Sequence, residues 1–111
     1  MEIIRITDFP LQETPRGIKG RHLVNIAAVS VMNLVLEPGE KVPLHKTPVD
    51  VLFHVIGGRG SVTIGEERSE VAAGEIVISP KMIPHALEAD TGDTFSVLVI
   101  KTPNPLKKAQ G

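Results

Sequence analysis

Residues 49–56 read Val-Asp-Val-Leu-Phe-His-Val-Ile, and their pattern decides the fold class. The odd-numbered positions are all apolar, whereas the even-numbered positions mix polar and apolar side chains. Successive side chains of a β-strand point to opposite faces, so this period of two predicts a strand whose odd face points into a core. The glycine-rich residues 57–60 follow and predict a hairpin turn, with residues 61–64 as the next strand.

Short apolar segments of the same kind lie on both sides of this stretch. The other predicted strands are residues 3–6, 23–36 (as one strand or two), 70–72, 76–78, 85–89 and 95–100. Gly and Pro fall between them, and the apolar residues are mostly Val, Ile and Leu, of which Val and Ile favour sheets. Because no stretch keeps the apolar period of a helix, the sequence predicts an all-β sandwich or barrel.

Composition excludes several classes of function. The chain has 111 residues, enough for one domain with its own core, and a net charge of −1, which provides no broad field for nucleic acid or anionic lipid. It has no Trp or Tyr to stack on bases and no Cys for disulfides or thiolate chemistry. No signal peptide or membrane-spanning apolar run is visible. We therefore expect a cytoplasmic protein without nucleic-acid or membrane partners.

Two segments resemble the two sequence motifs of the cupin family. The first begins at Gly39, five residues before His45, and the second begins at Gly74, five residues before Pro80. The residues in register with the family's motifs are Gly39, His45, Gly58, Gly74, Pro80 and His85. The short gap between the segments resembles that of the small microbial single-domain members, and the likeness spans about residues 34–100.

This resemblance implies a cupin barrel, a double-stranded β-helix or jelly roll of six to eight strands. We expect a single domain over residues 1–111. Its expected parts are the barrel over about 34–100, an N-terminal strand arm over 1–22 and a flexible tail over 102–111. We also expect a homodimer, because strands such as residues 97–100 are apolar on both faces.

The departures from the family pattern bear on function. Cupins usually hold a metal with three His and one Glu, and the resemblance leaves His45 and His85 as the two remaining metal ligands. The replaced positions are Thr47, Val51, Met82 and Ala89, which stand where the pattern has His, Glu, Gly and Asn. Two neutral imidazoles make a weak site for Mn, Fe, Ni or Zn, which need several donors. The expected cofactor is therefore one such divalent metal, weakly held, or none.

Other residues are candidates for the same site. His54 is a possible third ligand, but in a regular strand it lies on the face opposite Phe53, and only a β-bulge would turn it inward. His22 lies far from both motifs, and we interpret it as a surface residue. The residues expected to line the pocket are Thr47, Val49, Val51, Phe53, Val55 and Leu87.

Three functions stay open from the sequence. The first is a metal-dependent enzyme of dioxygenase or isomerase type that acts on a small molecule in the barrel mouth. The second is a non-catalytic ligand-binding or sensory module without metal, which the loss of half the ligand set favours. The third is a scaffold without ligand. The fold alone does not choose between them.

Overall fold

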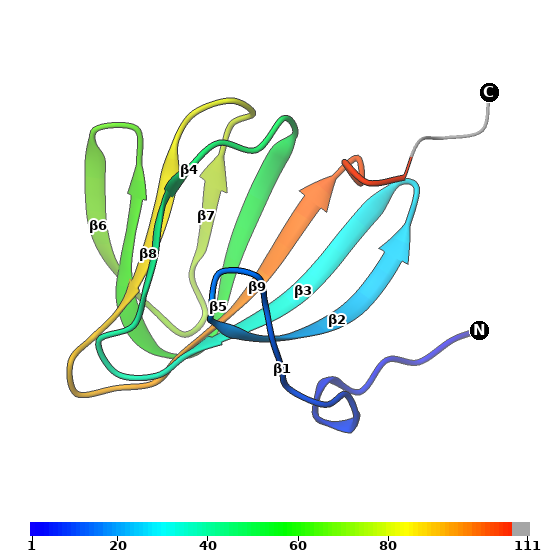
Figure 1. The fold of residues 1–111 in the computed structure, drawn as a ribbon, viewed down its shortest axis with the longest axis horizontal. Helices are drawn as coiled ribbons and strands as arrows, with labels where there is room; N and C mark the ends of the chain where they lie inside the picture. The colour runs from blue at the N-terminus through cyan, green and yellow to red at the C-terminus, as the bar shows by residue number, and fades with distance from the viewer. Residues whose placement is uncertain (108–111) are drawn as a thin grey trace.

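The computed structural model describes residues 1–107 and folds them almost entirely into strands (Figure 1). The elements are η1 (Ile6–Asp8), a 3-10 helix, and the strands β1 (Gln12–Glu13), β2 (Lys19–Ile26), β3 (Val29–Leu36), β4 (Lys41–His45), β5 (Asp50–Ile64), β6 (Glu67–Ala72), β7 (Ile76–Ser79), β8 (His85–Ala89) and β9 (Phe95–Thr102). Within the described residues there is no α-helix, which confirms the all-β prediction. No helix in this part of the chain is long and apolar enough to cross a membrane.

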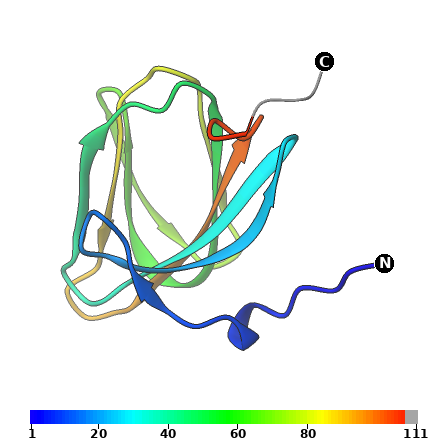
Figure 2. The same cartoon turned by 45° about the vertical axis from the view of Figure 1, so that its right-hand side comes forward.

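The strands form one curled sheet in the order β1-β2-β3-β9-β5-β8-β4, with β6 and β7 also pairing with β5. Figures 1 and 2 show it rolled into an open barrel, with β2, β3 and β9 on one side and β4, β6 and β8 on the other. The side chains that fill the barrel alternate along its central strands. They include Val51, Phe53 and Val55 from β5 and Phe95, Val97 and Val99 from β9.

β5 joins the two halves of the barrel. Its first part pairs with β7 and β9, and from Arg59 onward it pairs with β6 and β8. The hairpin turn predicted at residues 57–60 is therefore wrong, because the chain bends there without reversing. A register shift between Val55 and Gly57 marks a β-bulge, which supplies the bend.

Two glycines make this bend possible. Gly58 has a φ of 71°, and a Cβ at this position would overlap the carbonyl oxygen of Thr94. A Cβ on Gly60 would overlap the carbonyl oxygen of Glu88 and crowd the ring of Phe95. Glycine is required where another backbone approaches so closely. The glycines at residues 57–60 are thus present because other backbone segments pass close to a bend in β5. A hairpin turn would have a similar composition.

The N-terminal half differs from expectation in two places. Residues 3–6 form no strand, and the chain there leads into η1. Residues 23–36 form two strands, β2 and β3, which reverse at Ala27 and Ala28 and pair antiparallel. β2 begins at Lys19, before the predicted start of this segment.

The chain after β9 stays attached to the barrel. Asn104 is only 4% exposed, and its Nδ2 donates hydrogen bonds to Asn25 Oδ1 and to the carbonyl oxygen of Ile26. Its backbone N–H donates to the carbonyl oxygen of Ala27. The start of the predicted flexible tail is therefore anchored to the β2–β3 hairpin, whereas residues 108–111 of that tail lie outside the described residues.

Candidate functional site

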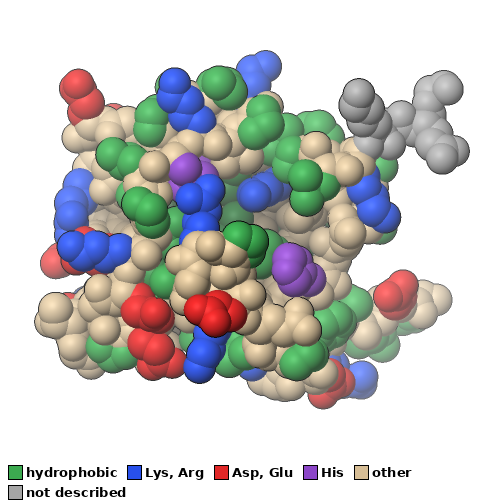
Figure 3. Space-filling model, in the orientation of Figure 1, with side chains coloured by type: hydrophobic (Ala, Val, Ile, Leu, Met, Phe, Trp, Pro, Cys, Tyr) green, Lys and Arg blue, Asp and Glu red, His purple; other side chains and the backbone are tan. Residues whose placement is uncertain are grey.

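A cavity of about 510 Å³ opens between the two halves of the barrel. Its apolar wall consists of Ile18, Met32, Leu34, Val42, Phe53, Leu87 and Val99, and its remaining lining residues are Thr14, Pro15, Arg16, His22, His45, His85 and Lys101. The space-filling view shows a recess in this face, with histidine and Lys or Arg side chains beside it (Figure 3). The volume lies in the usual range of small-molecule sites.

A β-bulge turns His45 into this cavity. Val42 also lines the cavity, so strict alternation along β4 would point Leu44 inward and His45 outward. The register of β4 against β8 shifts between Val42 and His45, and His45 becomes the direct partner of His85. Leu44 is left 59% exposed on the outer side. The bulge therefore places one histidine from each motif side by side.

The two imidazoles are hydrogen-bonded to each other. His45 Nε2 and His85 Nε2 lie 3.1 Å apart, and the ring planes meet edge to face at 85°. The ring of Phe53 packs edge-on against His85 with 5.1 Å between centroids. His85 is 3% exposed, whereas His45 is half-buried and nearer the solvent.

The partners of the pair determine where its protons lie. The carbonyl oxygen of Pro43 can only accept, so His45 Nδ1–H donates to it at 3.0 Å, and Nε2 of the neutral ring is an acceptor. His85 Nε2–H therefore donates to His45 Nε2. His85 Nδ1 is then the acceptor for the hydroxyl of Ser79 at 2.8 Å. Thr47 Oγ1, 3.3 Å from His85 Nε2, shares the proton of that nitrogen.

The surroundings keep both histidines neutral. Burial lowers the pKa of His85 to about 4, and the nearby His45, Lys101 and Arg16 act in the same direction. Burial also lowers the pKa of His45. The hydrogen bond to Pro43 acts in the opposite direction, whereas the positive charges of Arg16 and Lys101 lower this pKa further. Loss of hydration and nearby like charge both disfavour the imidazolium form.

The cavity carries positive charge without compensation. Among the described residues that line it there is no Asp or Glu, whereas Arg16 and Lys101 are both present. Burial lowers the pKa of Lys101, and the charge of Arg16 lowers it further. The ion pairs found within residues 1–107 use Lys41 and Arg68 with Glu88, on the outer side of the barrel.

The donor set offers two of the several protein ligands that a divalent metal needs. Within residues 1–107, no group of three or more His, Asp or Glu side chains is placed to hold a metal ion. With the protons placed as above, the two Nε2 atoms bind each other, and a metal would have to displace that hydrogen bond. Lys101 and Arg16 would also repel a cation in the cavity.

The structure distributes the residues predicted for the site over three environments. Phe53 and Leu87 line the cavity beside His45 and His85, and Thr47 is buried against His85. Two predicted wall residues, Val51 and Val55, are fully buried in the barrel core and do not line the cavity. Val49 precedes β5 and is likewise not a lining residue.

The other two histidines are not part of the pair. His54 is half-buried and sits between Phe53 and Val55, which face the core, so it points to the outer face of β5. The bulge in this strand comes after Val55 and so does not turn His54 inward. His22 is exposed, as a surface residue should be, but it also lines the cavity.

Arg16 and Lys101 were missed from the sequence. Lys101 had a detectable signal, because it continues the odd-numbered inward face of β9 after Val97 and Val99. Arg16 had none, because it lies in the turn between β1 and β2, and only the rolling of the sheet places that turn over the cavity. That turn is held by hydrogen bonds between Thr14 and Ile18 and between Gly17 and Thr14.

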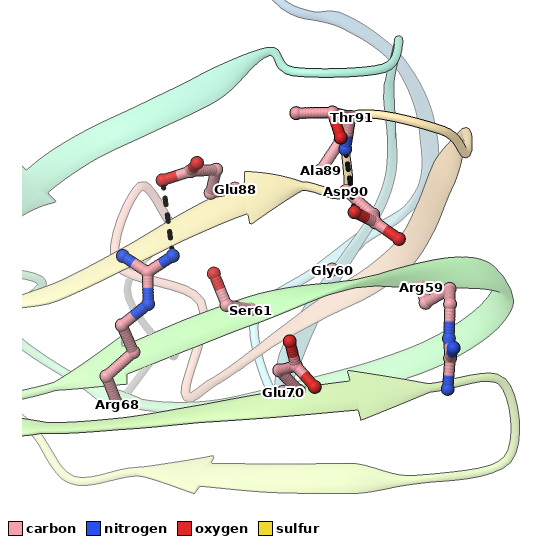
Figure 4. Close-up of a pocket in the computed structure, with 9 residues that line it drawn as sticks. All are labelled: Arg59, Gly60, Ser61, Arg68, Glu70, Glu88, Ala89, Asp90 and Thr91. Atoms are coloured by element: carbon pink, nitrogen blue, oxygen red, sulfur yellow. Dashed lines mark hydrogen bonds and ion pairs between the residues drawn. The ribbon is translucent and has the colours of Figure 1, made fainter.

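A second, smaller cleft lies on the outer side of the barrel. Its volume is about 120 Å³. Figure 4 shows Arg68 pointing to Glu88 at one end of the cleft, while Asp90 lies at the other end. Arg68 and Glu88 form an ion pair of 3.6 Å there. Because the charges of this cleft are of both signs and partly paired, it is a weaker candidate than the central cavity.

Known structures share this barrel. The polyketide cyclase RemF from Streptomyces resistomycificus superposes with a TM-score of 0.82 at 19% identity, over 92% of this chain and 79% of that one. An RmlC-like cupin family protein from Methanocaldococcus jannaschii gives a TM-score of 0.74 at 23% identity, over 88% and 91%. A predicted oxalate decarboxylase from Thermotoga maritima gives 0.81 at 17% identity, over 92% and 99%.

These identities show a common fold and no more. No curated protein gives a significant sequence match. The sequence profile of the cupin domain, however, matches residues 32–101, which covers most of the barrel and both histidine segments. By this match and by its barrel, the chain belongs to the cupin family.

Proposed function

We propose that this cupin binds a small organic molecule in its central cavity, with the His45–His85 pair as the polar contact and without a tightly held metal. The observation that carries the proposal is a hydrogen-bonded, neutral histidine pair set into an otherwise mostly apolar wall. Apolar surface supplies affinity in such a site, and a few fixed polar groups orient the ligand.

The histidine pair suits ligand recognition in its observed protonation state. The chain of donors runs from Ser79 through His85 to His45 and ends at Pro43, so each polar atom of the pair already has a partner. A ligand that donates to His45 Nε2 would replace a hydrogen bond of similar strength, and His85 Nε2–H would turn to the ligand or to Thr47. The exchange costs little and selects ligands with a polar group at this position.

A second candidate is a metal-dependent enzyme of dioxygenase or isomerase type. One observation favours it, since a separation of 3.1 Å between the two Nε2 atoms falls within the roughly 3–4 Å of two nitrogens on one metal. Metal binding would first require the proton on His85 to move to Nδ1, with Ser79 turning to accept it. The same fold carries a polyketide cyclase and a predicted oxalate decarboxylase, so catalysis on this barrel has parallels.

The test uses an uncharged apolar probe whose fluorescence rises in a non-polar site, N-phenyl-1-naphthylamine. We expect it to bind the wild-type chain and to bind Val99→Phe much more weakly, because Val99 faces the cavity. Ile100→Phe, on the opposite face of β9, is the matched control and should bind as the wild type does. Equal binding of the probe by the wild type and both variants, or binding by none of the three, would overturn the proposal.

Metal titration separates the two candidates. Melting temperatures with Mn²⁺, Fe²⁺, Ni²⁺ or Zn²⁺ should equal those without metal, because a ligand raises stability only when it binds the folded state. A metal-dependent rise that His85→Ala abolishes and His54→Ala retains would favour the enzyme over the ligand-binding protein.

A further inference from the structure

We propose that Lys101 and Arg16 form an anion-binding subsite at the cavity mouth, so that the ligand is a carboxylate with an apolar body. This inference rests on the proposed function, because it assigns the chemical class of the molecule that occupies the same cavity. The subsite consists of two residues that lie outside both family motifs and do not belong to the histidine pair.

The charge of the cavity is the first observation. Five of its lining side chains are basic or can become so, namely Arg16, His22, His45, His85 and Lys101, and no acidic side chain lines it. The neutral state of the histidine pair leaves the ammonium and guanidinium groups as the sources of charge. A cavity of one sign with low-dielectric walls concentrates ligands of the opposite sign.

The position of Lys101 is the second observation. It lies on the inward face of β9, one alternation beyond Val99, and it is half-buried. Its side chain makes no hydrogen bond or ion pair with any residue in the part of the chain that the structure describes. A partly desolvated ammonium without a counter-ion costs free energy, and a bound anion would remove that cost.

Arg16 reaches the same place from another part of the chain. The turn of Thr14–Ile18, closed by hydrogen bonds between Thr14 and Ile18 and between Gly17 and Thr14, holds it against the cavity. Arg16 and Lys101 both line the cavity, and the charge of Arg16 lowers the pKa of Lys101. The positive guanidinium and ammonium groups repel each other, and an anion bound between them would offset this repulsion.

The walls indicate the rest of the ligand. Met32, Leu34 and Val99 lie on the side of the barrel that carries Lys101, Phe53 is the cross-strand neighbour of Val99, and Leu87 lies on β8. A ligand that places its anion at Lys101 would therefore lay an apolar body along these side chains, with the histidine pair within the same cavity. We take the anion to be a carboxylate, which pairs with one planar guanidinium through two parallel hydrogen bonds, and a phosphate ester is the alternative that the experiment tests.

The experiment compares acids with their amides. Benzoate, phenylacetate and hexanoate are titrated by calorimetry alongside benzamide, phenylacetamide and hexanamide, with phenyl phosphate as a separate arm. We expect at least one acid to bind wild type more tightly than its amide. Lys101→Gln and Arg16→Gln should each weaken the binding of that acid by about tenfold or more, because one charge-assisted hydrogen bond is lost. Neither substitution should change the binding of the amide. Lys41→Gln, on the outer side of β4, is the matched control.

The outcomes separate this inference from the proposed function. Equal binding of acid and amide, or acid binding that Lys101→Gln leaves unchanged, would overturn the anion subsite. So would failure of every acid while N-phenyl-1-naphthylamine still binds in a manner sensitive to Val99→Phe, a result that leaves the proposed function standing. Tighter binding of phenyl phosphate than of every acid would overturn the carboxylate in favour of a phosphate ester.

Discussion

The Nε2 atoms of His45 and His85 lie 3.1 Å apart with one proton between them. The carbonyl oxygen of Pro43 fixes the tautomer of His45, and this in turn makes His85 the donor and Ser79 the donor to His85. The two rings therefore act as a single hydrogen-bonded unit. A proton added to His85 would go to Nδ1 and break the hydrogen bond from Ser79, whereas a proton added to His45 would go to Nε2 and oppose the proton that His85 donates.

Stability should fall as the pH falls from about 6.5 to about 4. The unfolded chain takes up a proton on His85 near the ordinary pKa of 6.5, whereas the folded chain does so only at about 4. Between these values the unfolded state binds more protons, so acid favours unfolding, by up to about 3 kcal/mol. Urea denaturation across this pH range measures the effect.

His85→Gln should flatten that pH dependence, because the group with the lowered pKa is gone. His54→Gln, at a histidine outside the cavity, should keep the slope of the wild type. A wild-type free energy of unfolding that stays constant from pH 6.5 to 4 would contradict the neutral, buried state of the pair.

Lys101→Met should raise the free energy of unfolding by about 1 kcal/mol. The substitution removes a half-buried charge without a counter-ion and keeps the apolar length of the side chain. Chemical denaturation at pH 7 checks it. Lys41→Met, which removes an exposed lysine 3.9 Å from Glu88, should change stability by no more than about 0.5 kcal/mol. A clear loss of stability in Lys101→Met would mean that the ammonium has a stabilising partner.

Gly58→Ala and Gly60→Ala should each destabilise the barrel by more than about 3 kcal/mol or prevent folding. A methyl group at either position would overlap a backbone carbonyl oxygen, of Thr94 or of Glu88, and Gly58 also has a positive φ. Gly92→Ala is the control, because no heavy atom lies within 4 Å of a Cβ built there. Near-wild-type melting of Gly58→Ala or Gly60→Ala would show that β5 does not pass so close to its neighbours.

The chain should form a homodimer through the outer face of its sheet. Ile76 and Ile78 on β7 are 59% and 69% exposed, and burial of such side chains drives self-association. Light scattering at micromolar concentration should give the mass of two chains for wild type. The double substitution Ile76→Lys and Ile78→Lys should give the mass of one. A wild-type mass of a single chain would contradict the prediction.

The sequence was most informative where a local pattern has only one structural meaning. The period of two in residues 49–56, the turn residues between apolar runs and the two histidine segments identified most of the strands, the barrel and the histidines that meet in the cavity. Residues 85–89 form a strand with the predicted bounds. These features depend on the chain's own alternation, which does not change when the strand packs.

The sequence was least informative where a residue's role depends on a distant neighbour. The glycines of residues 57–60 have the composition of a turn, yet they lie inside β5 because Thr94 and Glu88 pass close to them. Val51 follows the expected inward parity but lies in the packed core, because position along a strand, and not parity alone, decides which inward residues reach the cavity.

The sequence by itself thus predicted an all-β barrel, and it singled out His45 and His85, the two histidines that meet in the cavity. Only the tertiary structure decided how the pair is protonated, that no third ligand joins it among the described residues, and that Arg16 and Lys101 stand beside it. The physical reason is that strand periodicity is a property of successive residues. The β-bulge that turns His45 inward, in contrast, is set by pairing between segments far apart in the chain. The turn that carries Arg16 is closed by local hydrogen bonds, but only the rolling of the sheet places it over the cavity.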